Sequence, residues 1–583
     1  MADNDPISAH RIDRRSFLSG VGAAAVTVAV ASCSSGDGAS TGGSGGGSGG
    51  ASTSTSESPE VAAVPAPSAI GLPAGVFSLG VASGDPTDTS VMLWTRLVAD
   101  PLAAATAMGE RDLEVAYDVA LDEGFERLVA SGLASAPARL AHSVHLDVTG
   151  LDPGSWYHYR FRIGDQTSST GRTRTMPAPG AAGVTPGGAA AEQFRFVVAS
   201  CQDYQWGHYA AWRRAVETPD LDAVLFLGDY IYEYSVGDRS PGETGERVWA
   251  NEETHSLEQY RVRYGQVRSD PALIAAHEAV PWQITFDDHE VSNNYAGDVG
   301  QDDVDQPLSR DRRLAGYQAW YEHMPVRLDG VPESFESLRV HQALRFGDLV
   351  TLYAIETRQH ADPAPCRVEM PEGTPPLLYS DDRPSCEQRF DPERTNLGAA
   401  QEAWLLDELA ASDTTWNVLA NPIMFSGMNL ATREAPEYTL DTWDGYVASR
   451  ARVLGALAEV SNPVIVTGDW HASFVLDVRP ELIAEADDPA AVLPDGPPSS
   501  PPAMTEFVFT AISSVIFAQD YRAANDHIRY FEARNGYGVV TVTPEQLGCE
   551  FVYVDDVWDP DSPATTVDRW AVDAGSPQAR RVG

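Results

Sequence analysis

The sequence contains no lysine, and all 40 of its basic residues are arginine. They stand against 84 aspartate and glutamate residues, which gives a formal net charge of −44 at pH 7. Because nucleic-acid backbones bind basic patches, we expect no nucleic-acid-binding surface on a chain this acidic. The charge favours solubility, also at high salt, and the binding of divalent cations. A salt-adapted surface and a bias in base composition both explain the missing lysine, and both alternatives stay open.

The N-terminal region has only a short apolar run. Residues 21–31 are too few to cross a bilayer, which takes about 20 apolar residues. The run follows Arg14-Arg15-Ser16-Phe17-Leu18, which resembles a twin-arginine export signal. Val30-Ala31-Ser32-Cys33 resembles a lipobox, in which Cys33 becomes lipidated; the alternative is a cleaved signal with Cys33 unmodified. We expect twin-arginine export to the cell envelope or secretion, with membrane contact only through the lipid anchor.

Cysteine is scarce, with five residues in 583. Cys366 and Cys386 flank a proline-rich, irregular loop, and in an exported protein this favours a disulfide between them. Cys549 lies in a strand-like segment and is expected to be a buried free thiol. Cys201 belongs to a motif described below.

Changes in composition divide the chain into segments. Short strands with turn signals, such as Ser90–Arg96, predict an immunoglobulin- or fibronectin-like β-sandwich over residues 71–177. After residue 193, apolar runs alternate with helical patterns, which predicts a layered α/β domain. The predicted order is signal peptide 1–33, Ser/Gly-rich linker 34–70, β-sandwich 71–177, linker 178–192, α/β domain 193–560 and C-terminal tail 561–583.

The strands and helices of the α/β domain can be placed approximately from these patterns. Strands are predicted at 194–201, 223–227, 282–286, 349–355, 416–420, 463–467, 507–512 and 538–542. Helices are predicted near 209–217, 257–276, 309–323, 399–411 and 447–460.

Four of the apolar runs end in similar polar residues. The ends are Ser200-Cys201, Gly228-Asp229, Asp287-Asp288-His289-Glu290 and Gly468-Asp469-Trp470-His471. In α/β sheets the carboxyl ends of the strands form the ligand crevice, so these ends are expected to meet. Buried carboxylates and imidazoles without a strong partner cost several kcal/mol, on the order of 2–7 for a neutral polar group alone. The pattern therefore predicts a metal cluster.

The chain resembles the PhoD family of secreted alkaline phosphatases and phosphodiesterases over most of residues 77–560. The resemblance implies a four-layer αββα metallophosphatase-like sandwich behind a β-sandwich domain. It implies hydrolysis of phosphomonoesters, phosphodiesters or both, with a metal-bound oxygen as nucleophile, in phosphate scavenging. Besides the four strand ends, the motifs that carry it are Gly80-Val81-Ala82-Ser83-Gly84-Asp85-Pro86, Leu93-Trp94-Thr95-Arg96, Asp229-Tyr230-Ile231-Tyr232-Glu233 and Trp443-Asp444-Gly445-Tyr446.

The resemblance also implies ferric iron and calcium in the site. Thiolate and phenolate are good ligands for ferric iron, while carboxylate and carboxamide oxygens suit calcium. Side-chain alternation lets only one of Asp287 and Asp288 point inward easily; the superfamily pattern Gly-Asn-His-Glu favours Asp288, and both stay open. Carried over by motif, Cys201 and Tyr232 hold iron, Asp229 bridges the metals, Asp287 or Asp288 and Asn294 serve calcium, and Asp469 and His471 complete the cluster.

Two further residues are predicted to take part in catalysis. His289 is placed near the leaving group by the same alignment, while Glu290 is expected only to orient its neighbours. Arg358 is the candidate for holding the phosphate, because a guanidinium matches phosphate oxygens in shape and charge. Glu356 stands where related sequences carry Asp, so this chain departs from the family pattern at that position. Trp206 and His208 are alternative candidates for lining the entrance.

Three functions are compatible with these features. The first is a phosphomonoesterase or phosphodiesterase; the second is a phospholipase D-like enzyme acting on lipid head groups. The third is a non-catalytic, metal-stabilised envelope protein, which a phosphate-facing histidine argues against because structural metal sites are closed. The expected partners are phosphate-ester small molecules or phospholipids, and the chain is expected to be a monomer.

Overall fold

The computed structural model describes residues 61–103, 108–180, 193–235, 247–300, 308–328, 332–336, 338–366, 380–381, 386–433, 436–479 and 501–583. The predicted export signal, Cys33 and most of both predicted linkers lie outside these residues. In the part that the structure describes, no helix is both long enough and apolar enough to cross a membrane.

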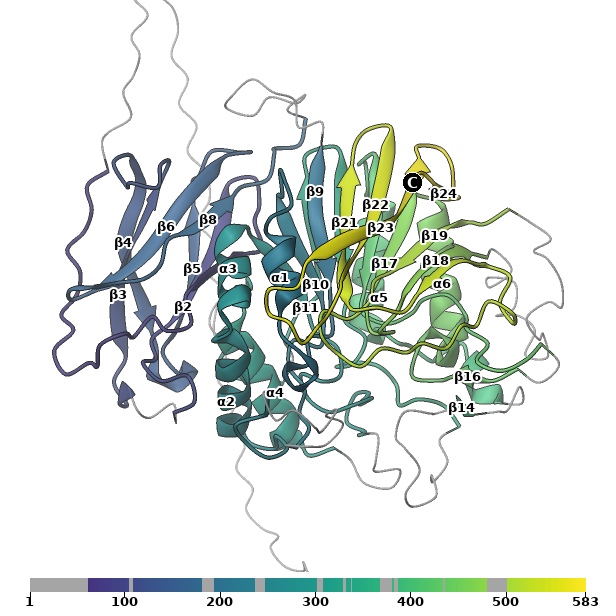
Figure 1. The fold of residues 1–583 in the computed structure, drawn as a ribbon, viewed down its shortest axis with the longest axis horizontal. Coiled ribbons are helices and arrows are strands. Elements are labelled where there is room, and N and C mark those ends of the chain that lie inside the picture. The colour runs from purple at the N-terminus through teal and green to yellow at the C-terminus, as the bar shows by residue number, and fades with distance from the viewer. Residues whose placement is uncertain are drawn as a thin grey trace, which may run out of the picture. The chain divides into compact units, whose positions relative to one another are not determined.

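Two large sheets form the core of the α/β domain (Figure 1). In one of them three parallel strands lie side by side, β9 (Phe194–Ala199), β10 (Ala223–Leu227) and β11 (Trp282–Thr285). This sheet continues through β21 (Gly536–Val542), β22 (Gln546–Val554), β23 (Ala564–Asp573) and β24 (Arg580–Arg581). The other sheet contains β12 (Gln342–Phe346), β13 (Val350–Ala354), β15 (Trp416–Asn421), β17 (Pro463–Thr467), β19 (Met504–Val508), β18 (Ser473–Val478) and β20 (Ile528–Glu532), in that order.

Helices cover the outer faces of both sheets, and the two inner faces pack on each other. Buried apolar residues such as Phe196, Leu225 and Val466 form the layer between the sheets. The first sheet is covered by α1 (Ala210–Ala215), α2 (Leu257–Arg268), α3 (Pro271–Ala279) and α4 (Arg310–His323), and the second by α5 (Gly398–Ala410) and α6 (Val447–Ala458). The predicted four-layer αββα arrangement is therefore confirmed.

The helix predicted over 257–276 is two helices. Pro271 cannot continue α2 because it lacks an N–H group, and it begins α3 instead. Asp270 caps α3 by accepting a hydrogen bond from the Ala272 N–H group. Ser256 and Gln259 form a capping box at the start of α2.

The predicted N-terminal β-sandwich is present, but one of its sheets is shared with the α/β domain. Its first layer is formed by β3 (Leu113–Ala120), β4 (Leu128–Ala136), β6 (Trp156–Ile163), β7 (Gln166–Thr167) and β8 (Gly171–Arg174). Its second layer is formed by β1 (Val81–Gly84), β2 (Ser90–Arg96) and β5 (Ser143–Thr149). Because β1 pairs in parallel with β11, this layer continues the first large sheet to ten strands.

Two predictions for the C-terminal part are corrected by the structure. Residues 561–583 are not a tail, since β23 pairs with β22 and the Trp570 side chain is buried in the core. The strand predicted over 507–512 is β19 and ends at Val508, so the residues after it form a loop that returns to the end of β9.

The predicted disulfide between Cys366 and Cys386 is present, with a Cα–Cα distance of 5.9 Å. Both residues pack against Tyr438 and Leu440. Cys549 is a buried free thiol in β22, as expected.

Candidate metal centre

The four polar strand ends meet at the carboxyl ends of β9, β10, β11 and β17. Five of the predicted ligand residues there have a left-handed backbone, with φ angles of 58° at Cys201, 59° at Asp229, 60° at Asp469, 52° at His471 and 49° at Asn294. This conformation costs a non-glycine residue about 1–2 kcal/mol. Such strain persists where the surrounding structure imposes it, and it is typical of functional sites.

One group of ligand atoms lies on the Cys201 side. The sulfur of Cys201, a carboxylate oxygen of Asp229 and a ring nitrogen of His471 all lie within 4.8 Å of one another. The Tyr232 hydroxyl joins this group, 3.1 Å from Asp229 Oδ2 and 3.2 Å from His471 Nε2. All four side chains are buried.

A second group shares Asp229 with the first. One ligand atom each from Asp229, Asp288 and His289 lie within 4.8 Å of one another. The Oδ1 atoms of Asp229 and Asp288 are buried, and no hydrogen-bond donor among the described residues reaches them. Buried carboxylate oxygens are stable only with a cation or donors, so these two atoms fit a metal site. Asp229 belongs to both groups and is therefore in position to bridge two metals.

The Asn294 carboxamide lies beside the second group. One terminal atom of the carboxamide lies 3.1 Å from Oδ2 of Asp288 and also 3.1 Å from Oδ2 of Asp441. With its nitrogen turned toward them Asn294 donates to both carboxylates; with its oxygen turned toward them three oxygens face one another, an arrangement that suits a hard cation. Asp441 was not predicted, although it lies two residues before the Trp443-Asp444-Gly445-Tyr446 motif.

The structure separates the roles of Asp287 and Asp288. Arg358 donates to the Asp287 carboxylate from Nε at 2.5 Å and from Nη2 at 3.2 Å. Asp288 faces Asp229 and His289, and its Oδ1 lies 3.9 Å from Arg358 Nη2. Arg358 is only 2% exposed, and its Nη1 lies 3.5 Å from Asp441. The predicted phosphate-binding arginine is therefore held among carboxylates, and its contact with phosphate stays a prediction.

His289 is fixed by a carboxylate that the sequence analysis gave no role. Its Nδ1 lies 2.7 Å from Oε2 of Glu233, whose other oxygen accepts a hydrogen bond from the Asn293 N–H group. The imidazole ring packs between the rings of Tyr232 and Tyr234. Burial by itself lowers the pKa of His289, but Asp288 and Glu233 outweigh it and raise the pKa well above its ordinary value.

Glu290 connects two of the ligand loops. Its carboxylate accepts backbone hydrogen bonds from Tyr230 at 2.6 Å, Asp287 at 2.9 Å and Asp229 at 3.2 Å. Gly228 allows the same loops to approach, because a Cβ at this position would lie 2.6 Å from Asp287 N. The residue expected only to orient its neighbours thus holds the ends of β10 and β11 together.

Four other residues named in the sequence analysis lie outside both groups. Asp469 is half-buried beside them. His208 donates its N–H group to Val557 O at 2.7 Å and lies near Arg247, and Trp206 is half-buried on the preceding turn. Glu356 accepts the backbone N–H groups of Arg358 and Gln359, so it shapes the turn that carries the arginine.

The protein environment alone opposes charge on the ligand groups. Burial raises the pKa of the Cys201 thiol well above its ordinary value, and Asp229 and Asp469 raise it further. Burial and Asp229 likewise raise the pKa of Tyr232. Burial is also the main reason why the pKa of Asp229 is raised. Bound cations reverse this balance, because they stabilise thiolate, phenolate and carboxylate together.

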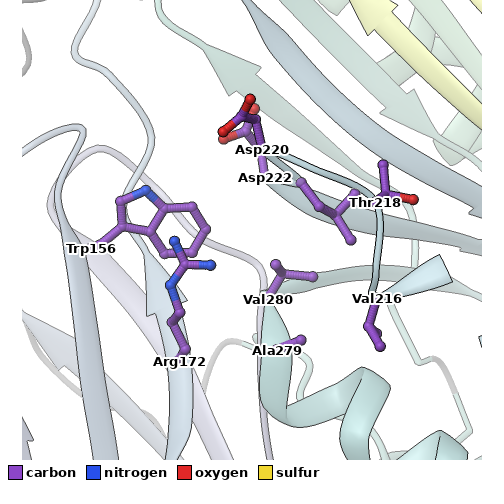
Figure 2. A pocket seen from close by; sticks show the side chains of 9 residues that line it. Trp156, Arg172, Val216, Thr218, Asp220, Asp222, Ala279 and Val280 are labelled. Carbon is purple, nitrogen blue, oxygen red and sulfur yellow. The ribbon is translucent and has the colours of Figure 1, made fainter. Parts of the chain in front are cut away.

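A separate cavity of about 250 Å³ lies at the opposite end of β10. There the Arg172 guanidinium lies 3.4 Å from the centre of the Trp156 ring, across from Asp220 and Asp222 (Figure 2). Asp222 precedes β10, whereas Asp229 follows it, so this cavity is not part of the candidate metal centre. Its lining is Trp156, Arg172, Val216, Thr218, Asp220, Leu221, Asp222, Ala279 and Val280.

The αββα fold, with thiol, carboxylate and imidazole groups at the carboxyl ends of its strands, defines a phosphoester hydrolase of the metallophosphatase class. The chain belongs to the PhoD-like phosphatase family, whose model matches residues 196–551, and the model of the family's N-terminal domain matches residues 65–177. The enzyme therefore hydrolyses phosphoric esters, and its substrates include small phosphate esters.

Two relatives support this assignment over most of the chain. Alkaline phosphatase D of Bacillus subtilis (strain 168) is 38% identical over 499 residues, which cover 84% of this chain and 79% of that protein. A solved structure of PhoD is 36% identical and matches with a TM-score of 0.77, covering 87% of this chain and 92% of the other. The family is metal-dependent. In this chain the candidate metal ligands are the two groups of atoms that share Asp229.

Proposed function

We propose that this hydrolase works with a mixed centre of ferric iron and calcium that shares the Asp229 carboxylate. The observation that carries the proposal is that Asp229 belongs to two groups of ligand atoms with different chemistry. The Cys201 group offers a thiol, a phenol and an imidazole, which are ligands for iron. The Asp288 group lies beside Asn294 and Asp441 and offers mainly oxygen atoms, which suit calcium.

When bound, such cations neutralise phosphate oxygens and activate a water molecule for attack on phosphorus. The chain's own residues orient and protonate the leaving group. Glu233 holds His289 at Nδ1 and leaves Nε2 to donate a proton to the oxygen of the departing alcohol as the P–O bond breaks. Arg358 binds the Asp287 carboxylate and lies 3.9 Å from Oδ1 of Asp288, so it fixes the position of both carboxylates beside the second group.

The proposed substrates are phosphomonoesters, phosphodiesters or both, hydrolysed to supply phosphate. Phospholipid head groups are the second candidate, supported by the lipobox-like sequence at Cys33, which would hold the enzyme at a membrane surface. The same proposal includes export by the twin-arginine route, which is supported by Arg14-Arg15-Ser16-Phe17-Leu18. It also includes action as a monomer.

Substrate and metal can be tested on the purified protein. Turnover of p-nitrophenyl phosphate, bis-p-nitrophenyl phosphate and phosphatidylcholine is compared with and without chelator, and the metal content is measured by elemental analysis. We expect turnover that the chelator abolishes. Full activity in metal-free protein would contradict the metal centre, and turnover of phosphatidylcholine alone would favour the phospholipase function.

Iron has a separate spectroscopic test. A phenolate bound to ferric iron gives a visible charge-transfer band, so the protein is expected to be coloured and Tyr232→Phe to lose the band. Tyr234→Phe is the matched control, because Tyr234 packs on His289 but its hydroxyl donates to Asn293. A colourless, fully active wild-type enzyme would refute the iron ligand set.

A further inference from the structure

The guanidinium of Arg268 is buried between the β-sandwich and the α/β domain. Arg268 is the last residue of α2 and is 1% exposed. Its charged group lies 4.2 Å from the centre of the Trp94 ring in β2. Nη1 makes one long contact, 3.5 Å to the Tyr230 hydroxyl, while no acceptor among the described residues reaches Nε or Nη2. A buried charge of this kind is costly unless it is paired.

The Nε and Nη2 atoms form the edge of a guanidinium that binds carboxylates in a fork. Other arginines of this protein use that edge in this way. Arg162 places Nε 2.7 Å and Nη2 2.9 Å from Asp118, and Arg261 places them 2.7 Å and 2.6 Å from Glu322. In Arg268 the same edge is buried and meets no protein acceptor. Its two N–H groups are therefore available to a further acceptor.

Two carboxylates close to this seam are already engaged. Glu322 is fully buried, and its carboxylate accepts hydrogen bonds from both Nε and Nη2 of Arg261. Glu278 accepts a hydrogen bond from Ser169. A second buried guanidinium, Arg96, adds positive charge; it donates to Ala141 O and contacts His323, which burial keeps neutral by lowering its pKa. Glu322 and Glu258 offset part of the charge of Arg96, whereas no acceptor among the described residues reaches the Nε–Nη2 edge of Arg268.

Hydroxyl groups of the sandwich lie in the same region. Tyr159 of β6 and Ser83 of β1 are fully buried, and their hydroxyls are neighbours. Burial raises the pKa of Tyr159, so its hydroxyl keeps its proton as a donor; Glu278 and Arg268 are close enough to influence it. The donors at this seam thus come from both domains.

We propose that the Nε–Nη2 edge of Arg268 binds a small inorganic anion of halide size at the seam between the β-sandwich and the α/β domain. A single-atom anion accepts both N–H groups at once and balances one charge. A phosphate would bring more charged oxygens than the few donors at this seam can satisfy. Because Arg268 belongs to α2 and Trp94 to β2, the bound anion strengthens the attachment of the sandwich to the catalytic part.

The test uses the purified full chain with its metals bound. Thermal unfolding is followed while chloride replaces gluconate at constant ionic strength, so that general screening stays unchanged. For the wild type we expect the unfolding midpoint to rise with chloride and to saturate, because a ligand that binds only the folded state stabilises it in this manner. Arg268→Met should unfold at a midpoint independent of chloride. Arg522→Met, which removes an exposed arginine paired with Asp520, should keep the wild-type response.

Bromide then locates the site. Crystals grown in bromide should give an anomalous-scattering peak within hydrogen-bonding distance of Arg268 Nε and Nη2. The proposal is overturned if the unfolding midpoint of the wild type does not change with chloride. It is also overturned if the crystals show water density, and no anomalous bromide peak, at the Nε–Nη2 edge. A bromide peak combined with a chloride-independent midpoint means an adventitious ion only and also overturns it. If Arg268→Met does not fold, the wild-type titration and the bromide crystals decide by themselves.

Discussion

Replacing Glu290 with glutamine should loosen two loops of the metal centre at once. The Glu290 carboxylate uses Oε1 to accept the Tyr230 N–H group and Oε2 to accept those of Asp287 and Asp229. Glutamine has the same shape, but one of the two positions becomes an NH2 group. That group faces a backbone N–H group in either orientation, so one or two of the three hydrogen bonds are lost and two donors are brought together.

The size of the effect follows from the charge and burial of the acceptor. Each hydrogen bond to a charged group is worth about 1.5–3 kcal/mol. Part of the loss is offset, because burial raises the pKa of Glu290 to about 8, so that much of the carboxyl is already neutral near pH 7, and because a neutral amide is easier to bury than a carboxylate. We therefore expect Glu290→Gln to lose about 2–4 kcal/mol of unfolding free energy, with metal content and turnover falling together.

The assay compares the urea midpoint, bound metal and p-nitrophenyl phosphate turnover of wild type and variant. Asp122→Asn is the control, because this carboxylate also accepts two backbone N–H groups, from Glu126 and Arg127, but in a loop of the β-sandwich. The control should keep wild-type metal content and turnover. Glu290→Gln with unchanged stability and metal content would show that the carboxylate does not hold the loops.

Two further predictions concern stability. Burial raises the pKa of Asp85 to about 7 in the folded state. Between about pH 4 and 7 the folded state therefore keeps a proton on Asp85 that the unfolded state has released. The free energy of unfolding falls by about 4 kcal/mol as the pH rises across this window. The variant Asp85→Asn should lack this pH dependence. The difference in unfolding free energy between wild type and variant should therefore be larger at pH 5 than at pH 7.5, and the same difference at both pH values would contradict the prediction. Cys366→Ser opens the disulfide to Cys386, at a sequence separation of 20 residues, and should cost about 3 kcal/mol in the loop-closure model. Reduced wild type should then unfold at the same midpoint as the variant, and a variant as stable as the oxidised wild type would refute the estimate.

The convergence of the strand ends could be predicted from the sequence because it depends on local patterns. An apolar run that stops at Gly228-Asp229 or Gly468-Asp469 marks both the strand and its carboxyl end. Parallel strands then bring these ends to one edge of the sheets. The layered fold follows from the same alternation of strands and helices, with the family resemblance supplying the order of the layers.

Other features of the site depend on contacts between distant residues, which no local pattern encodes. The inward direction of Asp288 could not be derived from strand alternation, because β11 ends at Thr285 and period two no longer applies beyond it. Arg358 reaches Asp287 across 71 positions in the sequence. The pairing of β1 with β11 likewise joins residues about 200 positions apart, and for this reason the two predicted domains proved to share a sheet.

The balance of charge in the centre explains why its features occur together. Asp229, Asp288 and Asp441 bring buried or nearly buried carboxylates to one place, while the only arginine paired with them in the described structure, Arg358, is bound mainly to Asp287. The imidazole of His289 is already paired with Glu233. The remaining negative charge therefore needs cations from outside the chain. The left-handed residues and the buried carboxylate oxygens that accept no hydrogen bond cost free energy, and metal ions bound at the centre would offset part of this cost.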